Sequence, residues 1–244
     1  MNKIKLILIY KDNKYFVKDL ESDFHTEFGF IKKDVLQSTK GGDLLTTNTG
    51  KEFSVFEPFF IDQYQKIKRG AQIISLKDIG VIIAECGINR DSVILDSGAG
   101  SGASVCFFAS VCKKVISYEL REDFYKIVQK NIDFLDLKNI TLKNQDIYLG
   151  IDEKNLDVII LDLPEPWNVI PHAIKALKPG GFLVSYSPCI PQVADFVNAL
   201  GSEFVHLKSV EVTEREWEIS QRKVRPKTRQ LGHTGFLTFT RKIV

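Results

Sequence analysis

Three carboxylates in this chain each follow a short apolar run of the kind that forms a buried strand. They are Asp96 after Val93–Leu95, Glu119 after Val115–Tyr118, and Asp162 after Leu156–Leu161. In doubly wound α/β sheets, ligands bind beyond the carboxyl ends of the strands, so these positions are typical of a binding or catalytic site. Carboxylates placed there can accept ribose hydroxyls, offset a positive charge or hydrogen-bond a reacting group.

The turn after Asp96 carries Gly98, Gly100 and Gly102 at alternating positions, and a helical pattern starts at Ala103. Strand, glycine turn and helix open a nucleotide-binding βα unit, because glycine lets the backbone approach a ligand and a helix N-terminus presents free N–H groups. The spacing satisfies both the G-x-G-x-x-G/A of dinucleotide enzymes and the G-x-G-x-G of S-adenosylmethionine enzymes. Asp96 favours the second class, because a carboxylate repels a pyrophosphate and attracts an ammonium or a sulfonium.

Two further acidic positions are consistent with an adenosine-containing cofactor. Glu119 ends the second predicted strand, where an acidic residue binds ribose hydroxyls. Asp146 follows a third predicted strand, 139–143, and is expected to accept a hydrogen bond from the adenine amino group. A helix or turn cap is the alternative role for Asp146.

The segment after Leu161 is Asp162-Leu163-Pro164-Glu165-Pro166-Trp167, whose two prolines predict an extended, stiff turn. Such a turn would hold Asp162 rigidly at the end of a central strand, and we therefore predict that Asp162 is the catalytic residue. Trp167 could stack on a base or pack at the start of the next helix, and we favour packing.

The turn Asp162–Trp167, following a glycine-turn unit, resembles the tRNA (adenine-N1)-methyltransferase family, whose members make 1-methyladenosine in the T-loop of tRNA. The other segments similar to that family are Gln72–Asp78, Tyr186–Ile190, Glu214–Trp217 and Arg225–Lys242, so the resemblance covers nearly the whole chain. One departure is Ala99, where the family usually has Thr; it removes a hydroxyl near the cofactor without abolishing binding.

The resemblance implies S-adenosyl-L-methionine as cofactor, no metal, adenine 58 of tRNA as target, and a homotetramer. Methylation of adenine 57 as well is known among archaeal relatives, and the sequence leaves that choice open. The residues expected to bind the cofactor are Gln72, Ile74, Ser97, Gly98, Gly100, Ser101, Gly102, Ala103, Glu119, Asp146, Ile147 and Asp162.

Asp162 suits the chemistry of adenine N1, whose lone pair is only weakly nucleophilic. A fixed carboxylate that accepts a hydrogen bond from the exocyclic amine increases electron density at N1 and stabilises the charge that develops on the ring. The target base must first be flipped out of the folded RNA, at a free-energy cost of a few kcal/mol.

The stretch from Ile219 to Lys242 contains seven Lys and Arg residues and no Asp or Glu. A local basic stripe on a chain of net charge +2 is suited to contacting phosphates, although a solvated loop is the alternative. We expect RNA contacts from Arg222, Lys223, Arg225, Arg229 and His233, while a purely structural role for His233 is the stronger interpretation.

Composition limits the class of protein. The chain of 244 residues is 44% hydrophobic and 26% charged, as is usual for globular proteins, and no apolar run approaches the length of a membrane span. Ile4–Tyr10 is interpreted as a strand and not a signal peptide. The cysteines, Cys86, Cys106, Cys112 and Cys189, lack metal-site spacing and are expected to be buried thiols in a cytoplasmic protein.

The predicted organisation is a small β-rich domain over residues 1–62, with a role in positioning RNA or in packing, and a doubly wound, Rossmann-like methyltransferase domain over 63–244. Expected strands in the second domain are 92–96, 114–119, 139–143, 156–161, 182–186, 204–212 and 234–240, the last two as an antiparallel pair. Expected helices are 75–86, 101–111, 122–135, 167–177 and 191–200.

Three other functions stay open at this point. A non-catalytic tRNA-binding subunit of the same fold should have an eroded glycine turn or Asp162 position, and both are intact here. An NAD-dependent oxidoreductase would be stabilised by NAD and not by S-adenosylhomocysteine. A small-molecule or protein methyltransferase is disfavoured by the basic stripe.

Overall fold

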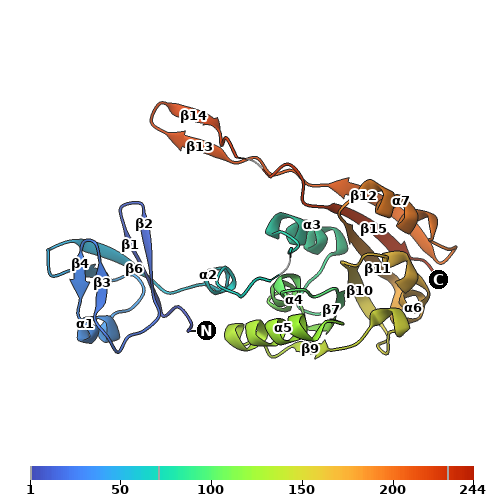
Figure 1. Ribbon diagram of the computed structural model, residues 1–244, viewed down its shortest axis with the longest axis horizontal. Coiled ribbons are helices and arrows are strands. Elements are labelled where there is room, and N and C mark those ends of the chain that lie inside the picture. The colour runs from blue at the N-terminus through green and yellow to red at the C-terminus, as the bar shows by residue number, and fades with distance from the viewer. Residues whose placement is uncertain (1, 71, 230) are drawn as a thin grey trace. The chain divides into compact units, whose positions relative to one another are not determined.

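The computed structural model describes residues 2–70, 72–229 and 231–244, and the chain divides into two compact units, Met1–Ile67 and Lys68–Val244 (Figure 1). The boundary expected from the sequence, between residues 62 and 63, lies within the short helix α2 (Phe60–Tyr64). Asp62 of this helix forms an ion pair with Lys14 at 2.6 Å, and the first unit extends to Ile67, so α2 belongs with the first unit.

The first unit is built on an antiparallel sheet with strand order β2-β1-β6-β5. These strands are β1 (Leu6–Tyr10), β2 (Asn13–Val17), β5 (Leu44–Thr46) and β6 (Glu52–Phe56); a hairpin of β3 (Phe24–Thr26) and β4 (Gly29–Ile31) and helix α1 (Lys33–Ser38) complete the unit. Leu8, Val17, Leu36 and Phe53 form its core. The β-rich character was predicted, whereas the two short helices were not.

The second unit contains a seven-stranded sheet of order β12-β15-β11-β10-β7-β8-β9. The strands are β7 (Val93–Ser97), β8 (Lys114–Tyr118), β9 (Ile140–Lys143), β10 (Leu156–Leu161), β11 (Leu177–Ser187), β12 (Phe204–Glu211) and β15 (Phe236–Lys242). Strands β7 to β11 pair in parallel, and β15 pairs antiparallel with both β11 and β12. The sheet is therefore mixed, with the predicted antiparallel pair at one edge.

Helices cover both faces of this sheet (Figure 1). They are α3 (Leu76–Cys86), α4 (Ala103–Ala109), α5 (Glu122–Leu135), α6 (Ile170–Ala176) and α7 (Ile190–Asn198). Leu95, Ile159 and Leu161 of the central strands pack against Ala173 of α6 and Phe196 of α7. Buried strands with apolar side chains on both faces require this layered arrangement, as expected for a doubly wound domain.

Several predicted elements differ from the structure. The helix expected over 167–177 begins as a 3₁₀ turn, Pro166–Val169, and becomes α6 only at Ile170. Lys178–Gly181, expected to end that helix as a loop, lies inside β11, which starts at Leu177 and not at 182.

A hairpin of β13 (Trp217–Ser220) and β14 (Lys223–Pro226) was not predicted, and it forms a small sheet of its own. Its turn uses Gln221 at φ 46°, where Gly or Asn would have given a recognisable turn signal.

None of the helices in the described ranges is long and apolar enough to span a membrane. The four cysteines are free thiols, as expected. The expected burial is confirmed for Cys106 and Cys112 but is wrong for Cys189, which is exposed, and only partly right for Cys86, which is half-buried.

Candidate active site

The glycine turn between β7 and α4 adopts a conformation that requires glycine. Gly98, Gly100 and Gly102 have φ values of +85°, +55° and +73°, which side-chain-bearing residues rarely adopt. A Cβ at Gly98 would lie 2.0 Å from the carbonyl oxygen of Asp162, and one at Gly102 would lie 2.9 Å from a methyl carbon of Val128. The turn is therefore pressed between the Asp162 backbone and helix α5.

Asp162 follows β10 directly, beside the glycine turn, as the sequence predicted. Its backbone N–H donates to the carbonyl of Ser97 at 2.9 Å, which ties the ends of β7 and β10 together. Burial raises the pKa of the Asp162 carboxyl to about 7, so its charge is poorly solvated. A group in this state is suited to accepting a hydrogen bond from a ligand.

Asp96 is 2% exposed, and its Oδ1 has no hydrogen-bond partner among the described residues. Burial raises the pKa of Asp96 to about 7; the charges of Asp162 and Glu119 add to this effect and a hydrogen bond with Ser104 opposes it. The three carboxylates thus lie close enough to raise the pKa of Asp96, and none of them forms an ion pair with another described residue. A positively charged ligand would stabilise this arrangement.

Glu119 lies immediately after β8 and is almost fully buried. Its Oε2 accepts a hydrogen bond from the backbone N–H of Gly100 at 2.8 Å, and its Oε1 accepts from that of Arg121 at 2.9 Å. The carboxylate is fixed before any ligand binds, with lone pairs left on each oxygen for hydroxyl donors.

A small cavity lies between the glycine turn and the segment that precedes α3. It is lined by Gln72, Ile73, Ile74, Gly98, Ala99, Ala103, Ser104 and Asp162. The structure thus brings Gln72 and Ile74 against the turn and Asp162, although these residues lie far apart in the sequence. Its volume is about 10 Å³, room for about one water molecule.

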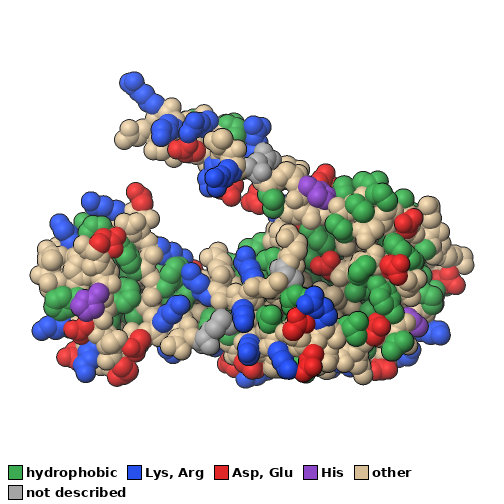
Figure 2. Space-filling view, viewed as in Figure 1, with side chains coloured by type: hydrophobic (Ala, Val, Ile, Leu, Met, Phe, Trp, Pro, Cys, Tyr) green, Lys and Arg blue, Asp and Glu red, His purple; other side chains and the backbone are tan. Residues whose placement is uncertain are grey.

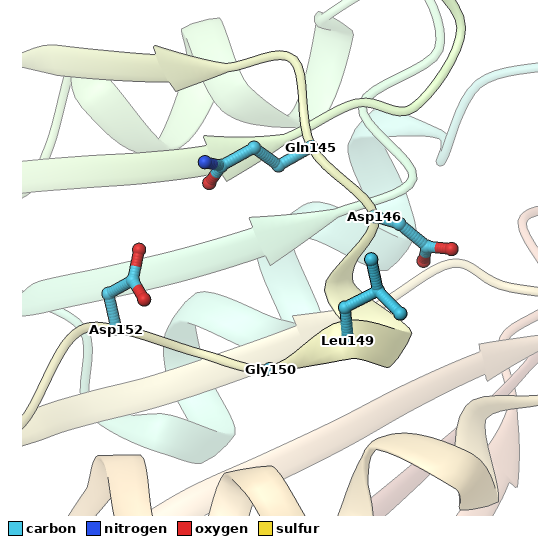
Figure 3. Close-up of a pocket in the computed structure, with 5 residues that line it drawn as sticks. All are labelled: Gln145, Asp146, Leu149, Gly150 and Asp152. Carbon is cyan, nitrogen blue, oxygen red and sulfur yellow. The ribbon is translucent and has the colours of Figure 1, made fainter.

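Asp146 lies in the loop after β9, and its Oδ1 accepts a hydrogen bond from the backbone N–H of Tyr148 at 2.9 Å. The turn-cap role therefore describes Oδ1 of Asp146, and Oδ2 has no hydrogen-bond partner among the described residues. A surface pocket of about 290 Å³ is lined by Gln145, Asp146, Leu149, Gly150 and Asp152. Figure 3 shows that the Asp146 carboxylate points away from Gln145 and Asp152. Ile147 is buried in the core.

The proline-containing turn after Asp162 is held by side chains from two other elements. The backbone N–H of Glu165 donates to the hydroxyl of Tyr148 at 3.2 Å, and Nε2 of Gln192 in α7 donates to the carbonyl of Pro164 at 2.8 Å. Trp167 packs against the core, as favoured from the sequence.

Of the seven Lys and Arg residues of the basic stripe, Arg222, Lys223 and Arg225 lie on the β13–β14 hairpin and Lys227 follows it. Figure 2 shows Lys and Arg side chains on this hairpin, and ion pairs offset part of their charge. Arg225 forms an ion pair with Glu218 at 3.1 Å, Lys223 lies 3.7 Å from the same carboxylate, and Lys227 pairs with Glu216. Both glutamates precede the window from Ile219 to Lys242, and antiparallel pairing brings them opposite its cations. Arg222 and Arg229 are exposed, with no ion-pair partner in the described ranges.

His233 makes two structural contacts. Its Nδ1 lies 2.5 Å from Oε1 of Glu211, and its Nε2 lies 2.9 Å from the carbonyl of Pro188. Because both ring nitrogens are engaged, the structural interpretation of this residue is the better supported one.

The sequence alone did not single out several residues that shape the site. Ser104, Tyr148, Gln192 and Asn131 all contact the predicted site residues or the backbone around them, but single polar residues within helices and loops carry no recognisable spacing.

Three features define the Rossmann-like methyltransferase class: a glycine turn after the first strand of a mixed, mainly parallel sheet, an acidic residue after the second strand, and an antiparallel closing pair. Residues 64–228 match the family model described as tRNA methyltransferase complex GCD14 subunit. The chain belongs to this family of tRNA (adenine-N1)-methyltransferases, which confirms the resemblance seen in its motifs.

Among similar proteins, the tRNA (adenine(57)-N(1)/adenine(58)-N(1))-methyltransferase TrmI of Methanocaldococcus jannaschii is 35% identical over 97% of this chain and 94% of its own. The tRNA (adenine(58)-N(1))-methyltransferase TrmI of Thermus thermophilus is 33% identical over 96% of both chains. The crystal structure of tRNA (m1A58) methyltransferase TrmI from Aquifex aeolicus has a TM-score of 0.82 at 25% identity and covers 100% of both chains.

Proposed function

We propose that this protein transfers the methyl group of S-adenosyl-L-methionine to N1 of adenine 58 in the T-loop of tRNA, with Asp162 as the catalytic residue. The observation that carries the proposal is the contact between the glycine turn and Asp162, in a chain of this family. Whether adenine 57 is also methylated, as in the name of the Methanocaldococcus relative, is decided by mapping the product.

The residues present fit the cofactor. Asp96 has an oxygen without a hydrogen-bond partner in the described part of the chain, and the pKa of Asp162 is raised; a cation would stabilise both carboxylates. Glu119 would hold the ribose hydroxyls, the free oxygen of Asp146 the adenine amino group, and the turn from Ser97 to Ala103 the methionine part. When bound, the cofactor supplies an electrophilic methyl group on a sulfonium.

Asp162 would act on the substrate base. Its ionised carboxylate accepts a hydrogen bond from the exocyclic amine of a flipped-out adenine, which fixes the base and increases electron density at N1. Methyl transfer would form the N1–C bond and break the C–S bond, with S-adenosylhomocysteine as the leaving group, and the carboxylate of Asp162 would stabilise the positive charge that develops on the adenine ring. One such interaction typically contributes about 10²- to 10³-fold to the rate.

The hairpin is our candidate for phosphate contacts, through Arg222 and, further along the chain, Arg229. Contacts of this kind position the RNA without reading its sequence and weaken with salt. Flipping the base costs a few kcal/mol, which these contacts and stacking would offset. The small β-rich unit is proposed to help position the RNA.

A homotetramer is also part of the proposal. Trp217, Ile219 and Val224 are 51%, 77% and 64% exposed, and the pairing register places them with Pro226 on one face of the hairpin. A two-stranded hairpin is marginally stable alone, so this apolar face is suited to burial against a second copy. Four free thiols support a cytoplasmic location, where disulfides are rare.

The test is incubation of the purified protein with unmodified tRNA and methyl-labelled cofactor, followed by digestion and mapping of the labelled nucleoside. We expect 1-methyladenosine at position 58. Label in another nucleoside, or thermal stabilisation by NAD and not by S-adenosylhomocysteine, would overturn the proposal. Binding of tRNA without any transfer would indicate a non-catalytic subunit instead.

A further inference from the structure

Asn131 lies in α5 and is fully buried. Among the described residues, its side chain forms hydrogen bonds only with backbone groups. Its Oδ1 accepts from the N–H of Lys68 at 2.8 Å, while its Nδ2 donates to the carbonyls of Lys68 at 2.9 Å and Ser101 at 2.8 Å. Lys68 begins the second unit, and Ser101 belongs to the glycine turn. One amide therefore joins two segments that are distant in sequence.

The chemistry at this position requires an amide. Asn offers an acceptor to one N–H and two donors to two carbonyls, and this is the set that the surrounding backbone demands. Aspartate has almost the same shape but only acceptors when ionised, so it would place an oxygen against the carbonyls of Lys68 and Ser101. An unmatched polar contact at a fully buried position is strongly unfavourable.

The neighbouring residues of α5 support the same junction. A Cβ at Gly70 would lie 3.2 Å from Ile127 and 3.3 Å from Phe124, so the backbone there rests against the helix. The N–H of Gly70 also donates to the hydroxyl of Ser101 at 2.8 Å. Phe124, Ile127 and Asn131 follow the i, i+3, i+7 spacing of one helical face.

This junction lies directly before Gln72 and Ile74, which line the cavity with Gly98 and Asp162. Displacement of residues 68–70 would move Gln72 and Ile74 away from the glycine turn. We infer that Asn131 is a positioning residue for the cofactor site: it anchors the Gln72–Ile74 segment to the glycine turn without touching the cofactor itself. The inference rests on the proposed function for the identity of the ligand.

The test compares Asn131→Asp with Asn139→Asp, using S-adenosylhomocysteine as the probe. Asn139 is a matched control, because its Nδ2 also donates to two carbonyls, those of Ala109 and Cys112, beside the start of β9 and away from the site. We expect Asn131→Asp to weaken S-adenosylhomocysteine binding at least tenfold in calorimetry and to raise KM for the cofactor more than it lowers kcat. Asn139→Asp should lower the melting temperature but bind like the wild type.

A second readout does not depend on the cofactor. Lys68 and Arg69 are exposed trypsin sites within the anchored segment. We expect Asn131→Asp to accelerate cleavage after them about tenfold, as followed by mass spectrometry of the fragments, and Asn139→Asp to leave it unchanged. Wild-type affinity and cleavage in Asn131→Asp, or equal losses in both variants, would overturn the inference. If the wild type fails to bind S-adenosylhomocysteine, the proposed function fails, while the cleavage rates still decide whether Asn131 anchors the segment.

Discussion

Gly98 and Asp162 touch through their backbones: a Cβ on Gly98 would lie 2.0 Å from the Asp162 carbonyl oxygen and 3.5 Å from its Cβ. The parallel register of β7 and β10 pairs Ser97 with Leu161, which places the two residues next in sequence side by side at the same edge of the sheet. The turn proposed to hold the cofactor and the carboxylate proposed to hold the base are therefore fixed relative to each other by the sheet itself.

Gly98→Ala should disrupt this contact. The added methyl group meets backbone, which cannot yield as a flexible side chain can, and φ of +85° is strained for alanine. We expect S-adenosylhomocysteine affinity to fall at least tenfold, with a loss of about 2 kcal/mol in the free energy of unfolding. Gly80→Ala is the control, since a Cβ there meets nothing within 4 Å, and replacing this glycine of α3 should stabilise the helix by about 0.5–1 kcal/mol. Equal binding by both variants would contradict the prediction.

Asp162→Ala and Asp162→Asn should retain cofactor binding and lose most methyl transfer. Because each variant removes the charged acceptor, we expect kcat to fall by about 10²- to 10³-fold. Single-turnover transfer to unmodified tRNA measures the effect, and titration with S-adenosylhomocysteine confirms that the site is intact. Normal turnover in either variant would refute the assigned role.

The pH dependence of stability should reveal the raised pKa values of Asp96 and Asp162. The pKa values of Asp96 and Asp162 are raised from 3.8 to about 7, so the folded cofactor-free protein binds more protons than the unfolded chain between those values. These two groups therefore contribute most to the free energy of unfolding at about pH 4 and below. Their contribution decreases as the pH rises from about 4 and is lost above about pH 7. Asp162→Asn should be about 2 kcal/mol more stable than the wild type at pH 8, and the difference should vanish towards pH 4. Urea denaturation at several pH values measures this, and parallel profiles for the two proteins would exclude it.

Arg222 and Arg225 should differ in their contribution to tRNA binding. Arg225 is already paired with Glu218, whereas Arg222 has no such partner in the described part of the chain. We expect Arg222→Ala to weaken binding and to reduce the slope of log K against log salt by about 1, the value for one phosphate contact, and Arg225→Ala to change it less. Filter binding at several salt concentrations tests this. An unchanged slope for Arg222→Ala would place the RNA on another face.

The apolar face of the hairpin should determine assembly. Trp217→Ser combined with Ile219→Ser removes most of the exposed apolar area of that face, so we expect a tetramer to dissociate to smaller species. Ser220→Ala is the control, because the pairing register places Ser220 on the opposite face together with Glu218. Sedimentation velocity gives the mass of each variant, and an unchanged tetramer in the double variant would show that another surface holds the copies together.

The sequence determined much of the site because its signals are local. Helix α5 and strand β10 have the predicted bounds, since their periodic apolar positions and flanking residues encode burial and termini directly. The glycine turn and the proline turn were recognisable for the same reason, because each needs particular residues at adjacent positions.

Only the tertiary structure decided which of these parts meet. In three cases, the register of strands or the face of a helix brings together residues that are not adjacent in sequence. These are the contact of Gly98 with Asp162, the hydrogen bonds of Asn131 to Lys68, and the ion pair of Arg225 with Glu218. A single polar residue has no periodicity, and the charge of a basic stretch depends on what antiparallel pairing places opposite it. Local patterns specify the elements, but the partners of individual side chains follow from packing in three dimensions.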